Sequence, residues 1–225
     1  MRLRKKKIGA SRLAACAHLL CQKPDAPISN AMRDFHREGD IHLEVGCGKG
    51  GFACGMAKQN PDVNFYAMER VNDVLMLAAE RAEREKDERP DNLRLILGGA
   101  AELAEYFAPG SLSCIYLNFS DPWPKKGYAK RRLTHRGFLR VYFTLLREGG
   151  ELRLKTDNTG LFDFTLEELD ALGLSPYFVT RDFHNTPEAE GNVMTEYETN
   201  FSSQGIAICS LRIKKQGELP PAEEQ

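Results

Sequence analysis

The sequence contains no apolar run that approaches the roughly 20 residues needed to cross a membrane. Its first seven residues, MRLRKKK, also lack the apolar stretch of a signal peptide. We therefore expect a cytoplasmic protein with no membrane partner. Internal repeats are absent as well. With 225 residues, of which 42% are hydrophobic, the chain can fill one core, so a single α/β domain with appendages is expected.

Cysteine pairs of the CxxC type are also missing, although six cysteines are present. The grouping Cys16-x-His18-x-x-Cys21 could be a fragment of a metal site. An amphipathic helix over SRLAACAHLL explains these residues better. We therefore expect no metal ion, and reduced thiols that pack as small hydrophobic groups.

The net charge of −1 hides a strong segregation of charge. Residues 1 to 24 carry seven Lys or Arg and no acid, and residues 121 to 140 carry seven against a single acid, Asp121. The other 181 residues hold 17 basic and 31 acidic groups. Two basic segments on an acidic body favour a polyanionic partner bound at a defined place. A solvated face with a charged tail is the alternative.

Short apolar runs alternate with helical patterns along most of the chain, which predicts a parallel sheet covered on both faces. Near the end, two further strands should form an antiparallel pair at one edge. The expected strands are 41 to 46, 64 to 69, 93 to 97, 112 to 119, 151 to 155, 177 to 183 and 205 to 214, and the expected helices are 50 to 59, 71 to 86, 100 to 107, 136 to 146 and 160 to 172.

These elements predict a Rossmann-like α/β fold with a seven-stranded sheet, mostly parallel with an antiparallel edge strand. The domain should extend over residues 37 to 216. A basic N-terminal arm, residues 1 to 36, would precede it and be partly disordered. The tail GELPPAEEQ, residues 217 to 225, has the composition of a disordered segment.

The stretch IHLEVGCGKGGF, residues 41 to 52, fits two kinds of cofactor site. As Gly46-x-Gly48-x-x-Gly51 it has the spacing of a dinucleotide fold, which holds a pyrophosphate. As Glu44-x-Gly46-x-Gly48-x-Gly50 it resembles the first motif of S-adenosylmethionine enzymes. A carboxylate at Glu44 would repel a pyrophosphate but suits an amino group and a sulfonium. Glu69, at the end of the second strand, could accept both ribose hydroxyls of either cofactor.

The stretch after the fourth strand is more informative. Two prolines in Asp121-Pro-Trp123-Pro stiffen the turn, so that an aromatic ring and a carboxylate would face the ligand cleft. Such a pair suits a flat heterocycle with N–H donors, such as guanine. The residues typical of a nicotinamide site are not seen. A purely structural turn is the alternative.

Four stretches, LEVGCGKG, NFSDPWPKKGYAKRRL, LKTDN and MTEYE, occur in an order and spacing similar to the bacterial tRNA (guanine-N7)-methyltransferase family. That family methylates guanosine 46 in the tRNA variable loop with S-adenosylmethionine. The resemblance covers about residues 40 to 210. The DPWP block followed by KRRL is its most specific part, because the glycine loop is common to many methyltransferases.

The resemblance implies roles for particular residues. Asp121 would lie at the catalytic centre. Because N7 of guanine carries a lone pair and no proton, we expect Asp121 to stabilise the charge on the ring or to hold the Watson–Crick edge rather than to remove a proton, and Trp123 or Tyr197 to stack on the base. One departure concerns the cofactor: the family has Asp-Ala where this chain has Gly99-Ala100. The Ala100 backbone could still contact the adenine, and either cofactor binding is weaker or Glu102 replaces the missing acid from the next turn. The implied cofactor contacts are Glu44, Gly46, Gly48, Glu69, Ala100 and Asp121; the substrate contacts are Lys125, Asp157, Thr195, Glu196, Tyr197 and Glu198; the RNA contacts are Gly127, Tyr128, Ala129, Lys130, Arg131 and Arg132.

Three alternatives stay open. An RNA-binding protein on a degenerate methyltransferase fold would explain Gly99 and the basic segments. A methyltransferase for a small molecule or a protein would leave the basic stretches as ordinary surface. A nicotinamide oxidoreductase would need the dinucleotide spacing to outweigh the DPWP block. The oligomeric state is open.

Overall fold

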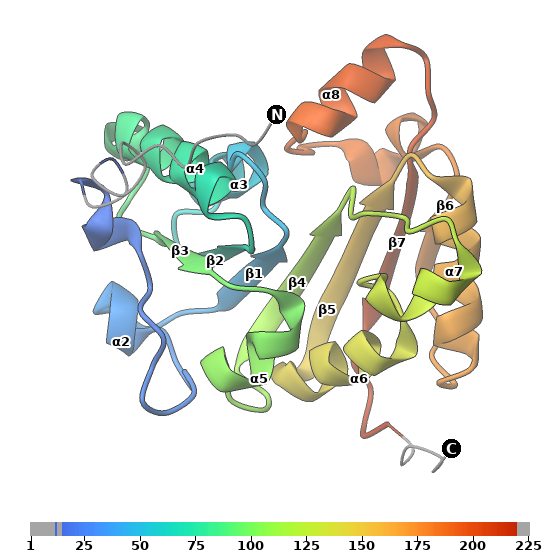
Figure 1. The fold of residues 1–225 in the computed structure, drawn as a ribbon, viewed down its shortest axis with the longest axis horizontal. Helices are drawn as coiled ribbons and strands as arrows, with labels where there is room; N and C mark the ends of the chain where they lie inside the picture. Colours follow the sequence, from blue (N-terminus) through green and yellow to red (C-terminus); the bar gives the residue numbers. More distant parts are fainter. Residues whose placement is uncertain (1–11, 13–14, 220–225) are drawn as a thin grey trace, which may run out of the picture.

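The computed structural model describes Arg12 and residues 15–219, so the basic residues 2 to 7 and the last part of the predicted tail lie outside the described residues. A seven-stranded sheet in the order β3-β2-β1-β4-β5-β7-β6 forms the centre of the molecule (Figure 1). Its strands are β1 (Ile41–Val45), β2 (Asn64–Glu69), β3 (Leu93–Leu97), β4 (Leu112–Asn118), β5 (Leu146–Thr156), β6 (Phe178–Thr180) and β7 (Cys209–Lys214).

All neighbouring strands are parallel except that β7 runs antiparallel to both β5 and β6. The predicted mostly parallel sheet with antiparallel pairing at one edge is therefore confirmed. Among the described residues, no helix combines the length and the apolar character that a membrane crossing requires.

Helices cover both faces of the sheet (Figure 1). One face carries α3 (Gly51–Gln59) and α4 (Asn72–Arg84), and the other carries α5 (Leu103–Tyr106), α6 (Arg136–Leu145) and α7 (Thr159–Asp170). The central strand β4 shows why two cores form: Ile115 and Leu117 belong to one hydrophobic cluster, while Cys114 and Tyr116 belong to the other. Alternate residues of a strand point to opposite faces, so a strand apolar throughout must be covered twice.

The described part of the predicted N-terminal arm packs on the domain. Leu20 bridges to Leu95 in β3, and the Tyr66 hydroxyl donates a 2.6 Å hydrogen bond to Asp34. Cys16 and Cys21 belong to the two different core clusters, so they lie on opposite faces of the sheet. All six cysteines are free and buried, as expected.

Four elements differ clearly from those predicted. The strand β5 begins at Leu146, five residues earlier than expected. The helix expected over residues 100 to 107 is divided into a 3-10 turn, η3 (Ala100–Glu102), and the short α5. The last strand begins only at Cys209, and β6 is shorter than expected.

The segment between β6 and β7 is not the simple polar loop that was predicted. It contains η5 (Phe183–Asn185), η6 (Pro187–Ala189) and the helix α8 (Glu196–Ser203). In Figure 1, α8 lies above the carboxyl ends of β4 and β5 rather than on a face of the sheet. Thr195 and Glu198 form a reciprocal capping box that starts α8. The T-x-x-E pattern in MTEYE was the sequence signal for this helix.

Candidate active site

The glycine loop between β1 and α3 borders open space. Gly46, Gly48 and Gly50 have φ values of 82°, 55° and 76°, a left-handed region that glycine enters without strain. Below the loop, the N–H groups of Gly46 and Cys47 both donate to the Met68 carbonyl in β2. A Cβ added at Gly46 or Gly48 would meet nothing within 4 Å. The loop is therefore held by the sheet on one side and free on the other.

Glu69 faces this loop from the end of β2. Its Oε2 accepts a 3.2 Å hydrogen bond from the Gly48 N–H, and its Oε1 accepts a 2.9 Å bond from the Val71 N–H. Two large apolar side chains near it, Val71 and Leu97, are each 44% exposed. Sequence reasoning did not identify these two, because nothing distinguishes them from core residues until the strand ends are known. Together they place an apolar surface beside an oriented carboxylate.

Glu44 is a buried carboxylate with a hydrogen-bond partner on only one of its two oxygens. Only 4% of the residue is exposed, and its Oε1 accepts a 3.0 Å hydrogen bond from the Asn118 side-chain amide. No described group bonds to its buried Oε2. Burial raises the pKa of Glu44 to about 7, against the opposing effects of Asn118 and of the Lys155 charge. A buried acceptor of this kind favours a ligand that brings a cationic N–H donor.

In the turn after β3, Gly99 stands at the position where the family that the sequence resembles has an aspartate. Gly99 donates its N–H to Glu102 Oε1 over 2.9 Å, so Glu102 is directed to its own turn. Ala100 is buried there, 7% exposed. An added Cβ at Gly99 would come no closer than 3.9 Å to any atom, and the closest are in Arg70 and Glu102.

The loop after β4, here the post-β4 loop (residues 119 to 125), has a strained backbone. Phe119 and Trp123 adopt φ values of 51° and 40°, which side chains other than glycine rarely adopt. The Phe119 N–H donates to the Lys155 carbonyl over 2.9 Å. The Arg132 guanidinium donates to the carbonyls of Pro122 and Trp123, each over 3.0 Å. Strain of this kind persists only where the surroundings fix it, and it is typical of functional sites.

Asp121 is presented outward by this loop. Its side chain is 71% exposed, and the Arg70 guanidinium lies 3.9 Å from its Oδ2. Arg70 directly follows Glu69 at the end of β2, so the loop after β4 and the end of β2 approach each other. Sequence reasoning did not identify Arg70. The carboxylates Glu44, Glu69 and Asp121 therefore come from three strands to one edge of the sheet, as predicted.

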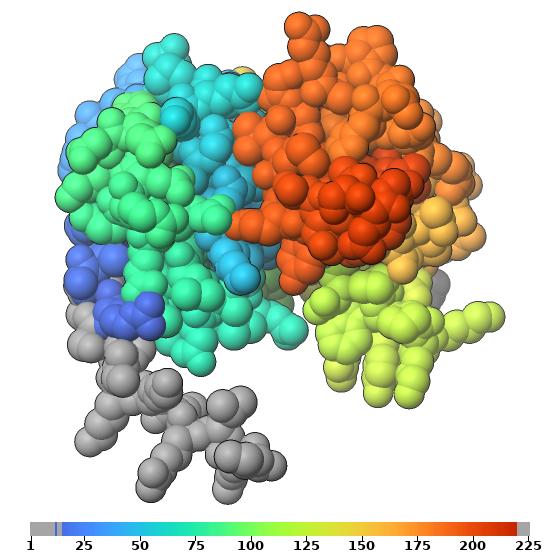
Figure 2. Space-filling model, turned by 90° about the horizontal axis from the view of Figure 1, so that it is seen from above, coloured from blue at the N-terminus to red at the C-terminus, as the bar shows by residue number. Residues whose placement is uncertain are grey.

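The basic side chains from Lys125 to Arg132 have two kinds of environment: the arginines contact the protein, and the lysines are exposed. The Arg131 guanidinium lies 5.1 Å from the Trp123 ring centre and 4.7 Å from that of Tyr128, and Arg132 holds the loop itself. In contrast, Lys125, Lys126 and Lys130 point to solvent. Most of the stretch forms a 3-10 segment, η4 (Lys126–Arg131), which also contains Gly127 and Ala129. In Figure 2 this yellow-green region projects from the surface beside the orange α8 segment.

Of the four predicted substrate residues at the start of α8, two are buried and two are exposed. Thr195 and Glu198 are buried and bond to each other through the capping box. Glu196 pairs with Arg81 of α4 at 2.6 Å, which bridges α8 to the glycine-loop side of the molecule. Tyr197 is 61% exposed and stacks on Phe119, with ring centres 6.4 Å apart. Asp157, half-buried beyond the end of β5, receives no hydrogen bond from a described residue.

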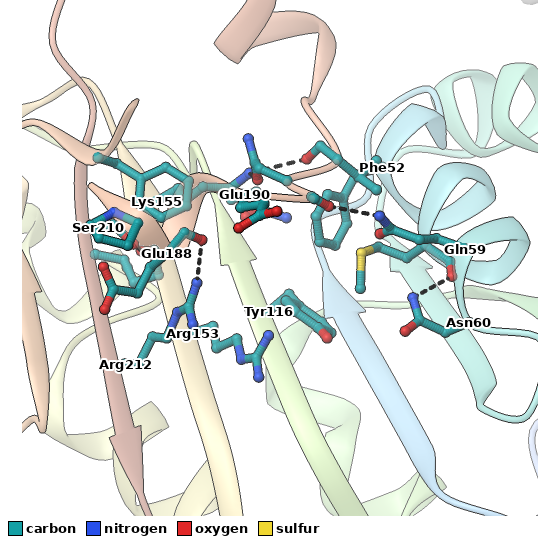
Figure 3. A pocket seen from close by; sticks show the side chains of 18 residues that line it. Phe52, Gln59, Asn60, Tyr116, Arg153, Lys155, Glu188, Glu190, Ser210 and Arg212 are labelled. Carbon is teal, nitrogen blue, oxygen red and sulfur yellow. Dashed lines mark hydrogen bonds between the residues drawn. The ribbon is translucent and has the colours of Figure 1, made fainter. Parts of the chain in front are cut away.

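A cavity of about 460 Å³ lies on the α3 face of the sheet, with Phe52, Asn118 and Lys155 among the residues that line it (Figure 3). Its floor is formed by β4, β5 and β7, and α3 and residues 183 to 193 form its walls. Arg153 and Arg212 are register partners on its floor. Each guanidinium group already has a partner within the protein: Arg153 pairs with Glu151 at 2.7 Å, and Arg212 donates to the Glu188 carbonyl. No sequence pattern predicted this cavity, because distant segments enclose it.

The model of the family described as "Putative methyltransferase" matches residues 38–211 of the chain. The protein belongs to this methyltransferase family. Every predicted site residue lies within the matched span, from Glu44 to Glu198.

Solved structures of methyltransferases resemble the domain. The 16S rRNA methyltransferase KamB gives a TM-score of 0.62 at 13% identity, covering 84% of this chain and 96% of its own. A 30S ribosomal A1408 methyltransferase from an uncultured bacterium gives 0.57 at 13% identity, covering 88% and 98%. Geranyl diphosphate C-methyltransferase from Streptomyces coelicolor A3(2) gives 0.53 at 13% identity, covering 92% and 76%. At these identities the likeness establishes the methyltransferase fold.

Replacing Glu44 with Gln should change how stability depends on pH. The folded-state pKa is raised to about 7 from 4.5, so between these values the folded protein binds a proton that the unfolded chain has lost. Stability from Glu44 therefore falls as pH rises through this window. From about pH 5 to about pH 8, the unfolding free energy of Glu44→Gln should gain roughly 2–3 kcal/mol relative to the wild type. Urea unfolding at both pH values measures it.

The matched control is Glu167→Gln, an exposed carboxylate on α7. Its unfolding free energy should follow that of the wild type at both pH values. A Glu44→Gln variant that also follows the wild type would show that Glu44 is not a buried titrating group.

Proposed function

We propose that this protein transfers the methyl group of S-adenosylmethionine to N7 of a guanosine in tRNA, at position 46 of the variable loop. One observation carries this proposal most strongly. Asp121 stands on a strained proline-stiffened loop, next to aromatic rings and exposed lysines, at the sheet edge where the glycine loop faces open space. Family membership supports the methyl transfer, and the similarity of the DPWP and KRRL stretches supports the tRNA substrate.

The residues present fit S-adenosylmethionine. The unpartnered Oε2 of Glu44 would accept from the amino group of the cofactor, and the space above Gly46 and Gly48 leaves room for its chain. Glu69 would bind the ribose hydroxyls, while the exposed side chains of Val71 and Leu97 would pack on the adenine ring. When bound, this cofactor supplies an electrophilic methyl group on a sulfonium.

Methylation at N7 places few demands on the protein. N7 of neutral guanine carries a lone pair and no proton, so the reaction needs no general base. The residues must therefore position the base and stabilise charge. The carboxylate of Asp121 would stabilise the positive charge that the purine gains, or hold its N–H edge. The exposed ring of Tyr197 would stack on the base once it leaves its neighbours.

The projecting lysines would bind the tRNA backbone. Phosphate contacts fix the orientation of a nucleic acid without reading its sequence, so selection would depend on the shape of the tRNA around the variable loop. Lys125, Lys126 and Lys130 are exposed and available for this role. Arg132 contributes indirectly, because its donors already hold the post-β4 loop.

The direct test is mass spectrometry of nucleosides from unmodified tRNA incubated with the protein and S-adenosylmethionine. We expect 7-methylguanosine, and none when guanosine 46 is replaced. RNA binding without catalysis is a second candidate, favoured by the missing acid at Gly99. Intact tRNA binding with no cofactor binding in calorimetry would support that candidate and overturn the proposed activity.

Asp121→Ala should lower the turnover number by about 10²- to 10³-fold, which is typical of a lost electrostatic stabiliser. Cofactor affinity should stay within a few-fold, because the carboxylate is placed against the base. Asp121→Asn keeps the shape and removes the charge, so it separates charge from hydrogen bonding. A parallel collapse of cofactor affinity in calorimetry would instead assign Asp121 to the cofactor site.

Gly99→Asp should tighten cofactor binding by roughly three- to tenfold, which corresponds to the net contribution of an ordinary hydrogen bond. The backbone there is extended, with φ −120° and ψ 166°, and an added side chain has room. The new carboxylate would accept from the adenine amino group. Gly99→Ala is the control, because it adds a Cβ without an acceptor. If calorimetry gives equal affinities for both variants, the adenine does not lie at this turn.

Replacing Lys125, Lys126 and Lys130 together with Ala should weaken tRNA binding and reduce its salt dependence. Each lost phosphate contact lowers the slope of log K against log salt by about 0.7 to 0.9, so the slope should fall by roughly two units. Arg132→Ala is the contrast: it should change the fluorescence of Trp123, the only tryptophan, with little change in slope. An unchanged slope in the lysine variant would remove this stretch from the RNA interface.

A further inference from the structure

Glu198 is an internal anion whose acceptor sites are already filled. It is fully buried, and its Oε2 accepts from Lys155 Nζ at 2.5 Å. Its Oε1 lies 2.8 Å from His184 Nε2 and 2.7 Å from the Asn192 amide nitrogen. Burial alone would raise the pKa of Glu198, but the Lys155 charge and these hydrogen bonds lower it. A carboxylate in this state has no free face for a substrate.

Lys155 connects two segments that border the catalytic cleft. Its carbonyl accepts the N–H of Phe119, which fixes the first residue of the post-β4 loop. Its ammonium group binds Glu198 in α8, and it also donates to the Asn192 side chain and the Val193 carbonyl. One residue of β5 therefore holds the post-β4 loop through its backbone and α8 through its side chain.

The segment before α8 depends on this attachment, because the cavity lies beneath it. Residues 187 to 193 form one wall of the cavity (Figure 3). Val193 packs against the core cluster that includes α3, and polar contacts hold the rest: Gln59 donates to the Gly191 carbonyl and Arg212 to the Glu188 carbonyl. Both bonds are individually weak. Lys155 donates to Asn192 and Val193 at the end of this segment and pairs with the buried Glu198 at the start of α8, so one side chain joins both to β5.

The helix that this pair holds carries an exposed aromatic ring. Tyr197 precedes Glu198 and stacks on Phe119, with an interplanar angle of 22°. Phe201, one turn further, stacks on both rings at 6.0 Å and 6.4 Å. Phe119 itself has the strained φ of 51°. Movement of α8 would therefore separate the Tyr197 and Phe201 rings from Phe119 in the post-β4 loop, at the border of the candidate active site.

We propose that the Lys155–Glu198 ion pair is a positioning unit, which fixes Tyr197 against the post-β4 loop so that Glu198 acts on base binding through Tyr197. Glu198 thus differs in role from a substrate contact, although it lies in the run MTEYE. The identity of the base as a tRNA guanosine rests on the proposed function. The positioning of Tyr197 does not.

A double-mutant cycle separates the two roles of Glu198. Glu198→Gln and Tyr197→Ala should each reduce kcat/KM for tRNA, by up to the roughly five- to hundredfold of one lost base-aromatic stack, with cofactor Kd unchanged within twofold. The double variant should be no worse than Tyr197→Ala, because both changes remove the same contact. Effects that multiply would show that Glu198 acts on the substrate by itself, and would overturn the proposal.

Hydrogen exchange tests the same unit without any substrate. Amides of α8 should exchange faster in Glu198→Gln and Lys155→Met than in the wild type, while those of α6 stay protected. His184→Ala, at a partly exposed position, provides a milder variant if Lys155→Met does not fold. The control is Asp163→Asn, which breaks the exposed Asp163–Arg181 pair and should leave α8 unchanged.

The two experiments fail in different ways. Unchanged exchange in α8 for Glu198→Gln and His184→Ala would overturn the positioning unit whatever the substrate is. A wild-type protein that forms no 7-methylguanosine, but whose α8 responds to Glu198→Gln, would overturn the proposed function and leave the positioning unit standing.

Discussion

Three polar side chains are buried at the carboxyl ends of β1, β4 and β5, and the architecture of this edge follows from the need to pair them. Glu44, Asn118 and Lys155 are each less than a tenth exposed. A buried polar group without a partner destabilises a fold by an amount comparable to a lost hydrogen bond, and a buried charge does so far more. The Asn118 amide therefore donates a hydrogen bond to Glu44, and Lys155 forms an ion pair with Glu198 of α8. The Oε2 atom of Glu44, which precedes the glycine loop by two residues, has no partner among the described residues.

The same need explains why a helix stands above the sheet at this edge. The α8 helix has one buried residue, Glu198, so apolar packing alone contributes little to its position. An ion pair requires a defined geometry, whereas apolar contacts tolerate sliding. A polar anchor therefore fixes the direction of α8 more closely than its few apolar contacts could. The Lys155 carbonyl accepts the N–H of the strained Phe119, so Lys155 fixes the position of both the post-β4 loop and α8.

Much of this edge could be predicted from the sequence, because parallel strands bring their carboxyl ends together. Glu44, Glu69 and Asp121 were expected at one edge, and the strands that carry them place them there. The helix α8 was missed although its T-x-x-E signature was present, because Tyr197 and Phe201 are the only apolar pair at helical spacing within it. The separation of Arg132 from the lysines was not predictable. A guanidinium reads the same in a sequence whether it binds phosphates or two loop carbonyls.

The distribution of charge then restricts how a polyanion could approach. Outside the two basic segments the chain carries 31 acidic and 17 basic groups, an excess of negative charge that disfavours contact with a nucleic acid there. The exposed side chains of Lys125, Lys126 and Lys130 belong to the yellow-green region that projects beside the α8 segment (Figure 2). The Tyr197 ring of α8 is also exposed. Attraction at the two basic segments and repulsion elsewhere would orient the partner before any base is contacted. Because phosphate contacts carry no sequence information, the choice of base would then depend on which nucleotide the bound shape brings to Tyr197 and Asp121.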